Sequence, residues 1–445
     1  MVILGSHRVR AVTAAATLAI AAAVATPAPA AAAQGGEAAR LERLQRLVAQ
    51  QQLQIDAQAR MLEALQREVK VLARAAAEAS ETASQAARRV TAAQPASHAQ
   101  EPRRLVKSGK DSIRLSLSGQ VNRGVLLTNE GHSTQIFHVD SDASSTRIRF
   151  VGTGNFNQDL SVGTQFEVQF ESNSSGTINQ FNSHDVGPDN FTGRKLELYL
   201  DSKRFGRLWV GRGDTASNST SQVNLSGSGV ISSSSVSNIA RAILFSRGGA
   251  QPLAGDVTVR DAFNNLDGLS RDDRLRYDTP AFRGVKLSAS VTAGGAWDGA
   301  ARYAAEILET KLAAAVAVWK QVGSRGINGS ISARHGSGVS LTFAAGTKDF
   351  DTVRRANSTF FYTRLGYLRE ILPALGDTAL ALDYFRGADH AAAGDQSTAY
   401  GAFIVQRIDR VATELYLGGR LYDLDRPGAR FQNIIAALSG ARIKF

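Results

Sequence analysis

Apolar and polar residues alternate with a period of two along most of the chain after residue 111, and Gly, Asn, Asp and Ser separate the alternating segments. In "TQFEVQFES", Phe166, Val168 and Phe170 oppose glutamine and glutamate side chains, and "RKLELYLD" repeats the pattern with leucines. Because successive side chains of a strand point to opposite faces, each segment predicts a β-strand with one apolar and one polar face. We predict sixteen strands, at residues 112–127, 144–155, 160–172, 193–203, 206–213, 270–279, 283–294, 300–309, 310–321, 327–335, 338–348, 357–370, 377–387, 397–408, 412–423 and 430–445.

The end of the chain indicates how these strands assemble. The final "LSGARIKF" places Ala441, Ile443 and Phe445 on one face of a strand, with Arg442 and Lys444 on the other. A closed sheet explains a chain that ends within a strand, because its last strand pairs with its first; an edge strand that simply stops is the alternative. A two-sheet sandwich shows the same alternation, but its outward faces are polar. The pattern therefore favours an all-β fold, a sixteen-stranded antiparallel transmembrane β-barrel that is apolar outside and wet within.

The amino terminus has the organisation of an export signal. His7, Arg8 and Arg10 precede the apolar run "AVTAAATLAIAAAVA" and the small residues "TPAPAAAA". This order predicts a signal peptide at residues 1–33, cleaved after Ala33 or two or three residues earlier. A permanent membrane anchor is the alternative, although the run is short and poor in Leu and Ile, and no other stretch approaches the roughly 18 apolar residues of a membrane helix.

Residues 37–90 contain neither Gly nor Pro and carry apolar residues in a heptad repeat. Such a repeat predicts an α-helical coiled coil that precedes the barrel, whereas an isolated amphipathic helix would bury little along so narrow a seam. Gln51 and Gln58 occupy core positions, where polar side chains fix register and oligomeric state. We therefore expect an oligomer. The predicted core residues are Leu44, Val48, Gln51, Ile55, Gln58, Leu62, Leu65, Val69 and Leu72.

Residues 91–111, rich in Pro, Ser and Ala, predict a linker between the coiled coil and the barrel. Residues 1–110 carry 15 basic and 8 acidic side chains, and residues 111–445 carry 36 and 32, so the net charge of +11 resides mostly outside the barrel. It therefore does not indicate a nucleic-acid-binding domain. The chain has no cysteine, which excludes disulfides and thiolate metal sites.

Several predicted strands carry sequences typical of one family. They are "LSLSGQVNRGVL", "STRIRFVGTG", "FGRLWVGRG", "RDDRLRYDTPAFRGVKLSAS", "TELYLGGRLYDLDR" and the closing "GARIKF". Together they resemble the general diffusion porins of Gram-negative outer membranes. The resemblance implies a homotrimeric, water-filled channel for passive diffusion of ions and small hydrophilic solutes. It also implies contacts with outer-membrane lipid and lipopolysaccharide, and neither cofactor nor metal. Phe445 is similar to the terminal signal that the barrel-assembly machinery reads.

The coiled coil is not part of the common porin pattern. It resembles the periplasmic stalk of a minority of porins, for which peptidoglycan is a candidate partner. Three other functions are alternatives to a diffusion porin. A trimeric autotransporter adhesin also joins a coiled coil to a barrel, but each of its chains needs only a few strands. A solute-specific channel for anions such as phosphate or carboxylates would carry a denser basic ladder. A hydrolase would need a catalytic arrangement of His residues, and none is recognisable, so the sequence predicts no enzyme.

The connection 214–269 is unusually long for a loop of a compact barrel, and such a loop needs a purpose. In the porins that the chain resembles, the third external loop folds into the lumen and narrows it, with acidic residues that face a wall of arginines. The resemblance implies loop acids at Asp256, Asp261 and Asp267, although the family's usual acidic loop-tip motif is absent. The wall candidates are Arg147 and Arg212 by resemblance, and Arg149, Arg274 and Arg276 by strand alternation.

Strict alternation puts Arg212 on the same face as Leu208 and Val210, which conflicts with a place on the lumen wall. The candidate arginines nevertheless outnumber the candidate acids. We therefore expect a mild preference for anions, because fixed positive charge attracts them where the pore is narrow. Arginines that are merely solvated in a wide lumen are the alternative.

Overall fold

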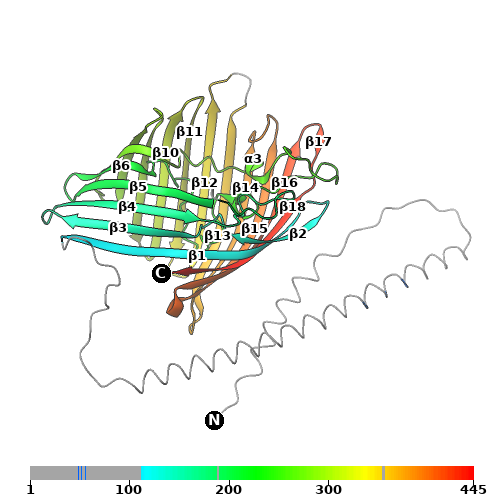
Figure 1. Ribbon diagram of the computed structural model, residues 1–445, viewed down its shortest axis with the longest axis horizontal. Helices are drawn as coiled ribbons and strands as arrows, with labels where there is room; N and C mark the ends of the chain where they lie inside the picture. Colours follow the sequence, from blue (N-terminus) through cyan, green and yellow to red (C-terminus); the bar gives the residue numbers. More distant parts are fainter. Residues whose placement is uncertain (1–48, 50–51, 53–55, 57–111, 188–189, 353–355) are drawn as a thin grey trace, which may run out of the picture. The chain divides into compact units, whose positions relative to one another are not determined.

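The computed structural model describes residues 49, 52, 56, 112–187, 190–352 and 356–445 (Figure 1). In these residues, eighteen strand segments form one antiparallel sheet that closes on itself. Segments β2 and β3 together make one strand of the barrel, and so do β17 and β18, which gives sixteen. The predicted all-β, sixteen-stranded antiparallel barrel is confirmed. The segments are β1 Ile113–Asn129, β2 Thr134–Asp140, β3 Arg147–Asn155, β4 Leu160–Phe170, β5 Phe191–Ser202, β6 Gly206–Asp214, β7 Arg271–Asp278, β8 Val285–Thr292, β9 Trp297–Ile307, β10 Thr310–Gln321, β11 Ser324–His335, β12 Val339–Phe350, β13 Ser358–Leu372, β14 Gly376–Ala388, β15 Gln396–Ile408, β16 Thr413–Arg426, β17 Ala429–Arg430 and β18 Ile434–Lys444.

The pairing of β1 with β18 closes the barrel, as the alternation at the chain end predicts. Phe445 extends this ladder, because its N–H donates to the carbonyl oxygen of Gly119 (3.0 Å) and its own carbonyl oxygen accepts from the Gly119 N–H (2.8 Å). A Cβ at residue 119 would lie 2.5 Å from the Phe445 ring and 2.8 Å from the carbonyl oxygen of Arg147. Only glycine lets the terminal ring approach the first strand so closely.

The second barrel strand differs from the prediction. The sequence predicts one strand at 144–155 after a connection, but β1 pairs with β3 along its first half and with β2 along its second half. Between them, residues 141–146 leave the ladder. Segment β2 was not predicted because polar and apolar residues mix on its faces: Ile136 is exposed on the outer face with His138, while Gln135 shares the inner face with the buried Phe137 and Val139. Period-of-two patterning cannot identify a strand that lacks one clearly apolar and one clearly polar face.

Large apolar side chains cover the outer face of the barrel, as expected of a surface that meets lipid. Leu196, Leu198 and Leu382 are 60% or more exposed, and equivalent positions on most strands carry Leu, Val, Ile or aromatic residues. One end of the barrel carries short turns, such as 203–205, and the other carries the longest loops. Among the helices of the described part of the chain, none is long and apolar enough to span a membrane.

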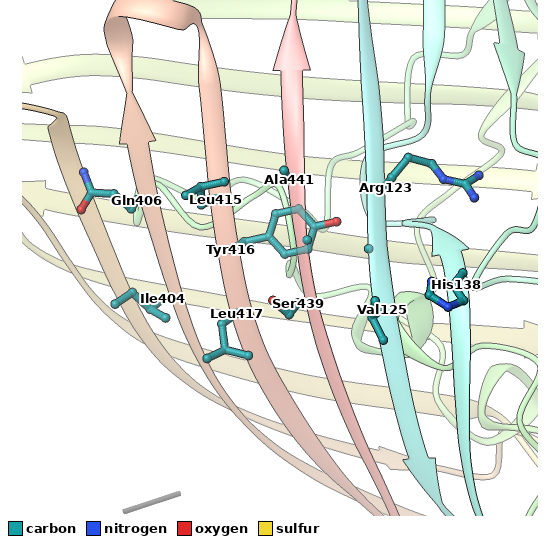
Figure 2. A pocket seen from close by; sticks show the side chains of 12 residues that line it. Arg123, Val125, His138, Ile404, Gln406, Leu415, Tyr416, Leu417, Ser439 and Ala441 are labelled. Carbon is teal, nitrogen blue, oxygen red and sulfur yellow. The ribbon is translucent and has the colours of Figure 1, made fainter. Parts of the chain in front are cut away.

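A groove of about 700 Å³ interrupts this apolar face where β15, β16, β18, β1 and β2 lie side by side (Figure 2). Ile404, Leu417 and Val125 border it, and the small residues Gly124 and Ser439 belong to its lining. Two polar side chains, Arg123 and His138, stand on the β1–β2 side of the groove (Figure 2). Both belong to the middle of the barrel wall rather than to its ends.

The described residues before the barrel are few. Ala49, Gln52 and Asp56 are helical, and the Gln52 side-chain amide donates to the Asp56 carboxylate (3.2 Å). The signal peptide 1–33, the linker 91–111 and the coiled-coil core positions from Leu44 to Leu72 lie outside the described residues and remain predictions.

Candidate functional site

The longest loop, residues 215–270 between β6 and β7, folds into the barrel, and we call it the inner loop (Figure 1). It contains a 3₁₀ turn, η3 (Val236–Ile239), and a single helical turn, α3 (Val259–Ala262). Near its start, the Ser217 N–H donates to the Asp298 carboxylate of β9 (2.7 Å). Because Asp298 is buried on the lumen side of its strand, this contact holds the loop against the inner wall.

The inner loop then crosses the inner faces of successive strands. On β11, Ser330 Oγ accepts from the Val223 N–H (2.9 Å). On β16, Tyr422 donates its hydroxyl to the Val236 carbonyl oxygen (2.7 Å). On β15, Ser397 Oγ donates to the Ala262 carbonyl oxygen (2.6 Å). Together with a hydrogen bond from the Ala216 N–H to Ser290 Oγ on β8 (3.0 Å), these contacts line one side of the lumen from β8 to β16, and apolar contacts continue the coverage to β18, β1 and β2.

His390, in the connection between β14 and β15, ties the returning part of the loop to the wall. Its Nδ1 accepts from the Asn264 N–H (3.1 Å), and its Nε2 lies 2.8 Å from the Thr359 carbonyl oxygen. This arrangement fits a neutral ring that donates from Nε2. Burial lowers the pKa of His390, which also favours the neutral form.

An apolar core fills the space between the inner loop and the wall. The Phe263 ring of the loop lies 5.0 Å from Tyr422 and 5.7 Å from Phe385, centroid to centroid, and all three side chains are buried. The expectation that the barrel is wet throughout is wrong on this side. Strands such as "TFFYTRLGYL" place Phe and Tyr on both faces, so alternation could not reveal an apolar inner surface. Further core members are Leu126, Phe137, Ile231, Val236, Ile239, Ile243, Phe245, Phe360, Ile434 and Leu438.

Strands β3, β5 and β7, which contribute no residue to the apolar core, present a group of basic side chains to the lumen. We call Arg147, Arg149, Arg194, Lys195 and Arg271 the lumen basic cluster. Among the described residues, two carboxylates form ion pairs with them. Glu167 of β4 binds Arg149 and Arg194, with the Arg194 Nε 2.7 Å from it. Asp214 of β6 binds Lys195 (2.5 Å) and Arg271 (3.0 Å). Five cations therefore share two anions.

The predicted wall arginines divide into three groups. Arg147 and Arg149 face the lumen, and among the described residues Arg147 has no ion pair or hydrogen bond from its side chain. Arg212 lies opposite Leu196, which is 64% exposed, and cross-strand neighbours share a face, so its side chain lies on the outer surface. For Arg212 the alternation gives the right face and the resemblance the wrong one.

Arg274 and Arg276 face inward but serve the start of the inner loop. Arg274 is buried against Glu197 and donates to the carbonyl oxygen of Asp214 (3.0 Å). Arg276 donates to the carbonyl oxygen of Thr215 (2.9 Å). Their guanidinium groups are engaged with protein, so they offer less to passing solutes than Arg147 and Arg149.

The three predicted loop acids are also engaged with their own loop. Asp261 forms a capping box with Thr258 at α3. Asp267 accepts the Ser219 N–H (2.7 Å) and the Ser221 hydroxyl (2.7 Å). Asp256 accepts the Leu253 N–H (2.7 Å) and pairs with Arg247. The first role of these carboxylates is to shape the loop.

Sequence reasoning missed Arg194 and Arg271 of the lumen basic cluster, and Arg442 on β18. Arg442 sits on the polar face of the last predicted strand, so alternation alone could have identified it. Arg194 could not be found this way, because a bulge opposite Glu167 and Val168 puts both Arg194 and Lys195 on the lumen side. In the described part of the chain, no group of three or more His, Asp or Glu residues could hold a metal ion.

The comparisons with known proteins agree with this architecture. A family model described as Gram-negative porin matches residues 82–426. The anion-selective porin from Comamonas acidovorans is 14% identical over 75% of this chain and 100% of its own, with a TM-score of 0.53. A loop L8 deletion mutant of OmpT, an outer membrane protein of Vibrio cholerae, is 11% identical over 75% and 100%, with a TM-score of 0.50. At such identities these two likenesses show the fold alone. No curated protein sequence matches the chain.

Proposed function

Because this chain belongs to the Gram-negative porin family, its barrel is an outer-membrane channel for passive diffusion and not an enzyme, and we propose that the lumen basic cluster gives it a mild preference for anions. The inner loop covers the side of the lumen that runs from β8 through β16 and β18 to β1 and β2, so permeating ions pass along the β3–β7 side. On the β3–β7 side, we propose that the inner loop, which the sequence predicts as the connection 214–269, constricts the pore. A fixed positive field in a narrow wet passage attracts anions and repels cations without binding either tightly.

One observation carries this proposal: five basic side chains share two carboxylates, and Arg147 has no partner among the described residues. The side chain of Arg149 is 39% exposed and that of Arg271 is 28% exposed, so part of this charge is accessible to solutes. The loop acids are already bonded within the inner loop, so they offset the positive charge of the cluster incompletely.

The test is the reversal potential of reconstituted channels in a salt gradient. Replacing Arg147 and Arg149 by glutamine should move it toward cation preference, most clearly in dilute salt, because screening weakens the field as ionic strength rises. Arg212→Gln is the control, since it removes one arginine charge from the outer face and should leave the reversal potential unchanged. An unaltered ion preference in the Arg147/Arg149 variant at low ionic strength would refute the cluster's role.

The density of the basic cluster also favours a second candidate, a channel specific for anionic solutes such as phosphate or carboxylates. The two kinds of channel differ in how their conductance depends on anion concentration. A diffusion channel passes current in proportion to anion concentration, whereas a specific channel saturates and shows competition between anions. Conductance measured over a concentration series of phosphate in constant chloride separates them.

A further inference from the structure

A fully buried group of charges lies between the inner loop and the wall, remote from the lumen basic cluster. Arg364 of β13, Asp383 of β14 and Arg420 of β16 have side chains that are 0% exposed. Arg364 and Arg420 both donate to Asp383 Oδ2 (2.7 and 2.9 Å), and Arg420 Nη1 also lies 2.7 Å from Oδ1. We call these three residues the buried ion cluster. Two guanidinium cations share one carboxylate there, so Asp383 alone offsets their positive charge.

The inner loop joins this cluster through neutral groups only. Arg364 Nη1 donates to Ser228 Oγ (2.9 Å) and to the Ser232 carbonyl oxygen (2.9 Å). The Ser232 hydroxyl accepts from Arg420 (2.8 Å) and donates to Asp383 (3.2 Å). The wall therefore supplies all three charges, and the loop supplies hydroxyl and carbonyl dipoles that complete their shell.

Aromatic rings close the cluster off from water. The Arg420 guanidinium lies 5.1 Å from the centroid of the Phe403 ring, and that of Arg364 lies 5.6 Å from the Tyr362 ring. The Tyr362 hydroxyl adds a further donor to Asp383 (3.0 Å). In such surroundings an arginine that loses its carboxylate has no water to replace it.

We propose that Asp383 is the positioning residue of the inner loop, because it balances the charge that lets Ser228 and Ser232 dock on Arg364 and Arg420. Loss of this carboxylate leaves two guanidinium groups buried against neutral acceptors. We expect the loop around Ser232 then to leave the wall, so that water enters and solvates the two unbalanced guanidinium groups. The consequence for permeation rests on the proposed role of the inner loop as the pore constriction.

The absence of cysteine from the chain allows a direct measurement of loop position. Val230 is 2% exposed, lies between the two docking serines and belongs to the apolar core, so Val230→Cys marks a buried loop position. In folded, full-length channels this thiol should react slowly with a water-soluble maleimide. Adding Asp383→Asn should raise the labelling rate on the order of a hundredfold, the change that corresponds to loss of one partner from a buried ion pair.

Glu414→Gln is the matched control. It removes one nearly buried carboxylate from the same inner wall, but Glu414 pairs with Arg442 and Lys444 rather than with the inner loop. Its labelling rate should equal that of the parent. If Asp383→Asn labels no faster than Glu414→Gln, the positioning role of Asp383 is overturned.

A loop-side variant covers the case in which Asp383→Asn fails to fold. Ser228→Ala with Ser232→Ala leaves every strand unchanged and should also raise the labelling of Val230→Cys; unchanged labelling there overturns the proposal. Single-channel recording then separates the two ideas. Faster labelling with larger, noisier currents supports both, whereas faster labelling with an unchanged, quiet current supports the positioning role and refutes the constriction.

Discussion

At the scale of single residues, the contact between Gly119 and Phe445 decides how the chain end completes the barrel. Replacing Gly119 by alanine should push the Phe445 ring away, because the new Cβ would lie well inside van der Waals distance of the ring and of a backbone oxygen. We expect reduced outer-membrane levels with unchanged synthesis and export, as also for deletion of Phe445, whose role as an assembly signal is our proposal. Quantitative immunoblotting of membrane fractions measures this.

Gly248→Ala is a suitable control for the glycine substitution. No atom lies within 4 Å of a Cβ placed there, although the positive φ of 59° adds local strain in the inner loop. Its membrane level should stay near that of the parent. Equal membrane levels for Gly119→Ala and the parent would show that the ring contact is dispensable for assembly.

Glu171 is the second residue whose chemistry follows from its surroundings. It is 4% exposed at the start of the loop after β4, and burial, followed by the nearby Asp142 and Asp140 carboxylates, raises its pKa from 4.5 to about 8. Gln169 donates to one of its oxygens (2.8 Å), and Arg194 only partly offsets the rise. The folded state thus holds a proton that the unfolded chain releases above pH 4.5.

Because the pKa of Glu171 is higher in the folded state than in the unfolded state, the free energy of unfolding falls as the pH rises. Below pH 4.5 the Glu171 carboxyl is protonated in both the folded and the unfolded state, so it does not lower the free energy of unfolding. As the pH rises toward 8 this free energy falls, by at most on the order of 5 kcal/mol. Glu171→Gln, which stays neutral, should therefore unfold at a higher temperature than the parent at pH 8 and at a similar one at pH 4. Thermal denaturation followed by circular dichroism at both pH values tests this; parallel pH profiles would contradict it.

At the scale of elements, the sequence predicted best where a strand has one polar and one apolar face. The strands from β3 to β12 alternate in this way, and their predicted positions agree with the observed ones to within a few residues. The prediction failed at β2, where polar and apolar residues mix on each face, and it gave no sign that the inner face of β13 to β16 carries buried aromatic side chains such as Phe385 and Tyr422. That face exists to bind the inner loop, a contact between segments more than a hundred residues apart in sequence.

In the candidate site, too, some residues could be predicted from the sequence and others could not. The family resemblance named Arg147, alternation added Arg149, and alternation also gave the correct face for Arg212. Alternation works at Arg149 and Arg212 because each lies in a regular ladder. It could not identify Arg194, which a bulge turns inward, or foresee that Arg274 and Arg276 would be engaged by the inner loop. Pairings such as Arg364 with Asp383 depend on register between strands, which a single sequence does not specify.

At the scale of the whole molecule, we propose that the channel is a homotrimer and that the groove on the outer face lies in a subunit interface (Figure 2). Arg123 is about 13 Å along the strand from Gly119 at a rise near 3.3 Å per residue, well inside the belt that would face lipid. Its side chain is 46% exposed, although it pairs with the buried Asp140 and donates to Ser172 (2.6 Å). Arginine facing lipid near the bilayer midplane costs about 2–4 kcal/mol, and a protein partner avoids that cost.

A bulky side chain at the groove therefore tests the interface. Ser439 is an exposed residue of the groove lining, and Ser439→Trp should fill the space that a neighbouring subunit needs. Ala289→Trp on β8 is the matched control, because it adds the same ring to an exposed position in the opposite half of the strand order. Unheated, detergent-extracted parent and Ala289→Trp channels should give three chains by native mass measurement. Ser439→Trp should give monomers, or trimers that dissociate at a clearly lower temperature. Trimers of equal heat stability in both variants would show that this face meets lipid, and a monomeric parent would refute the oligomer itself.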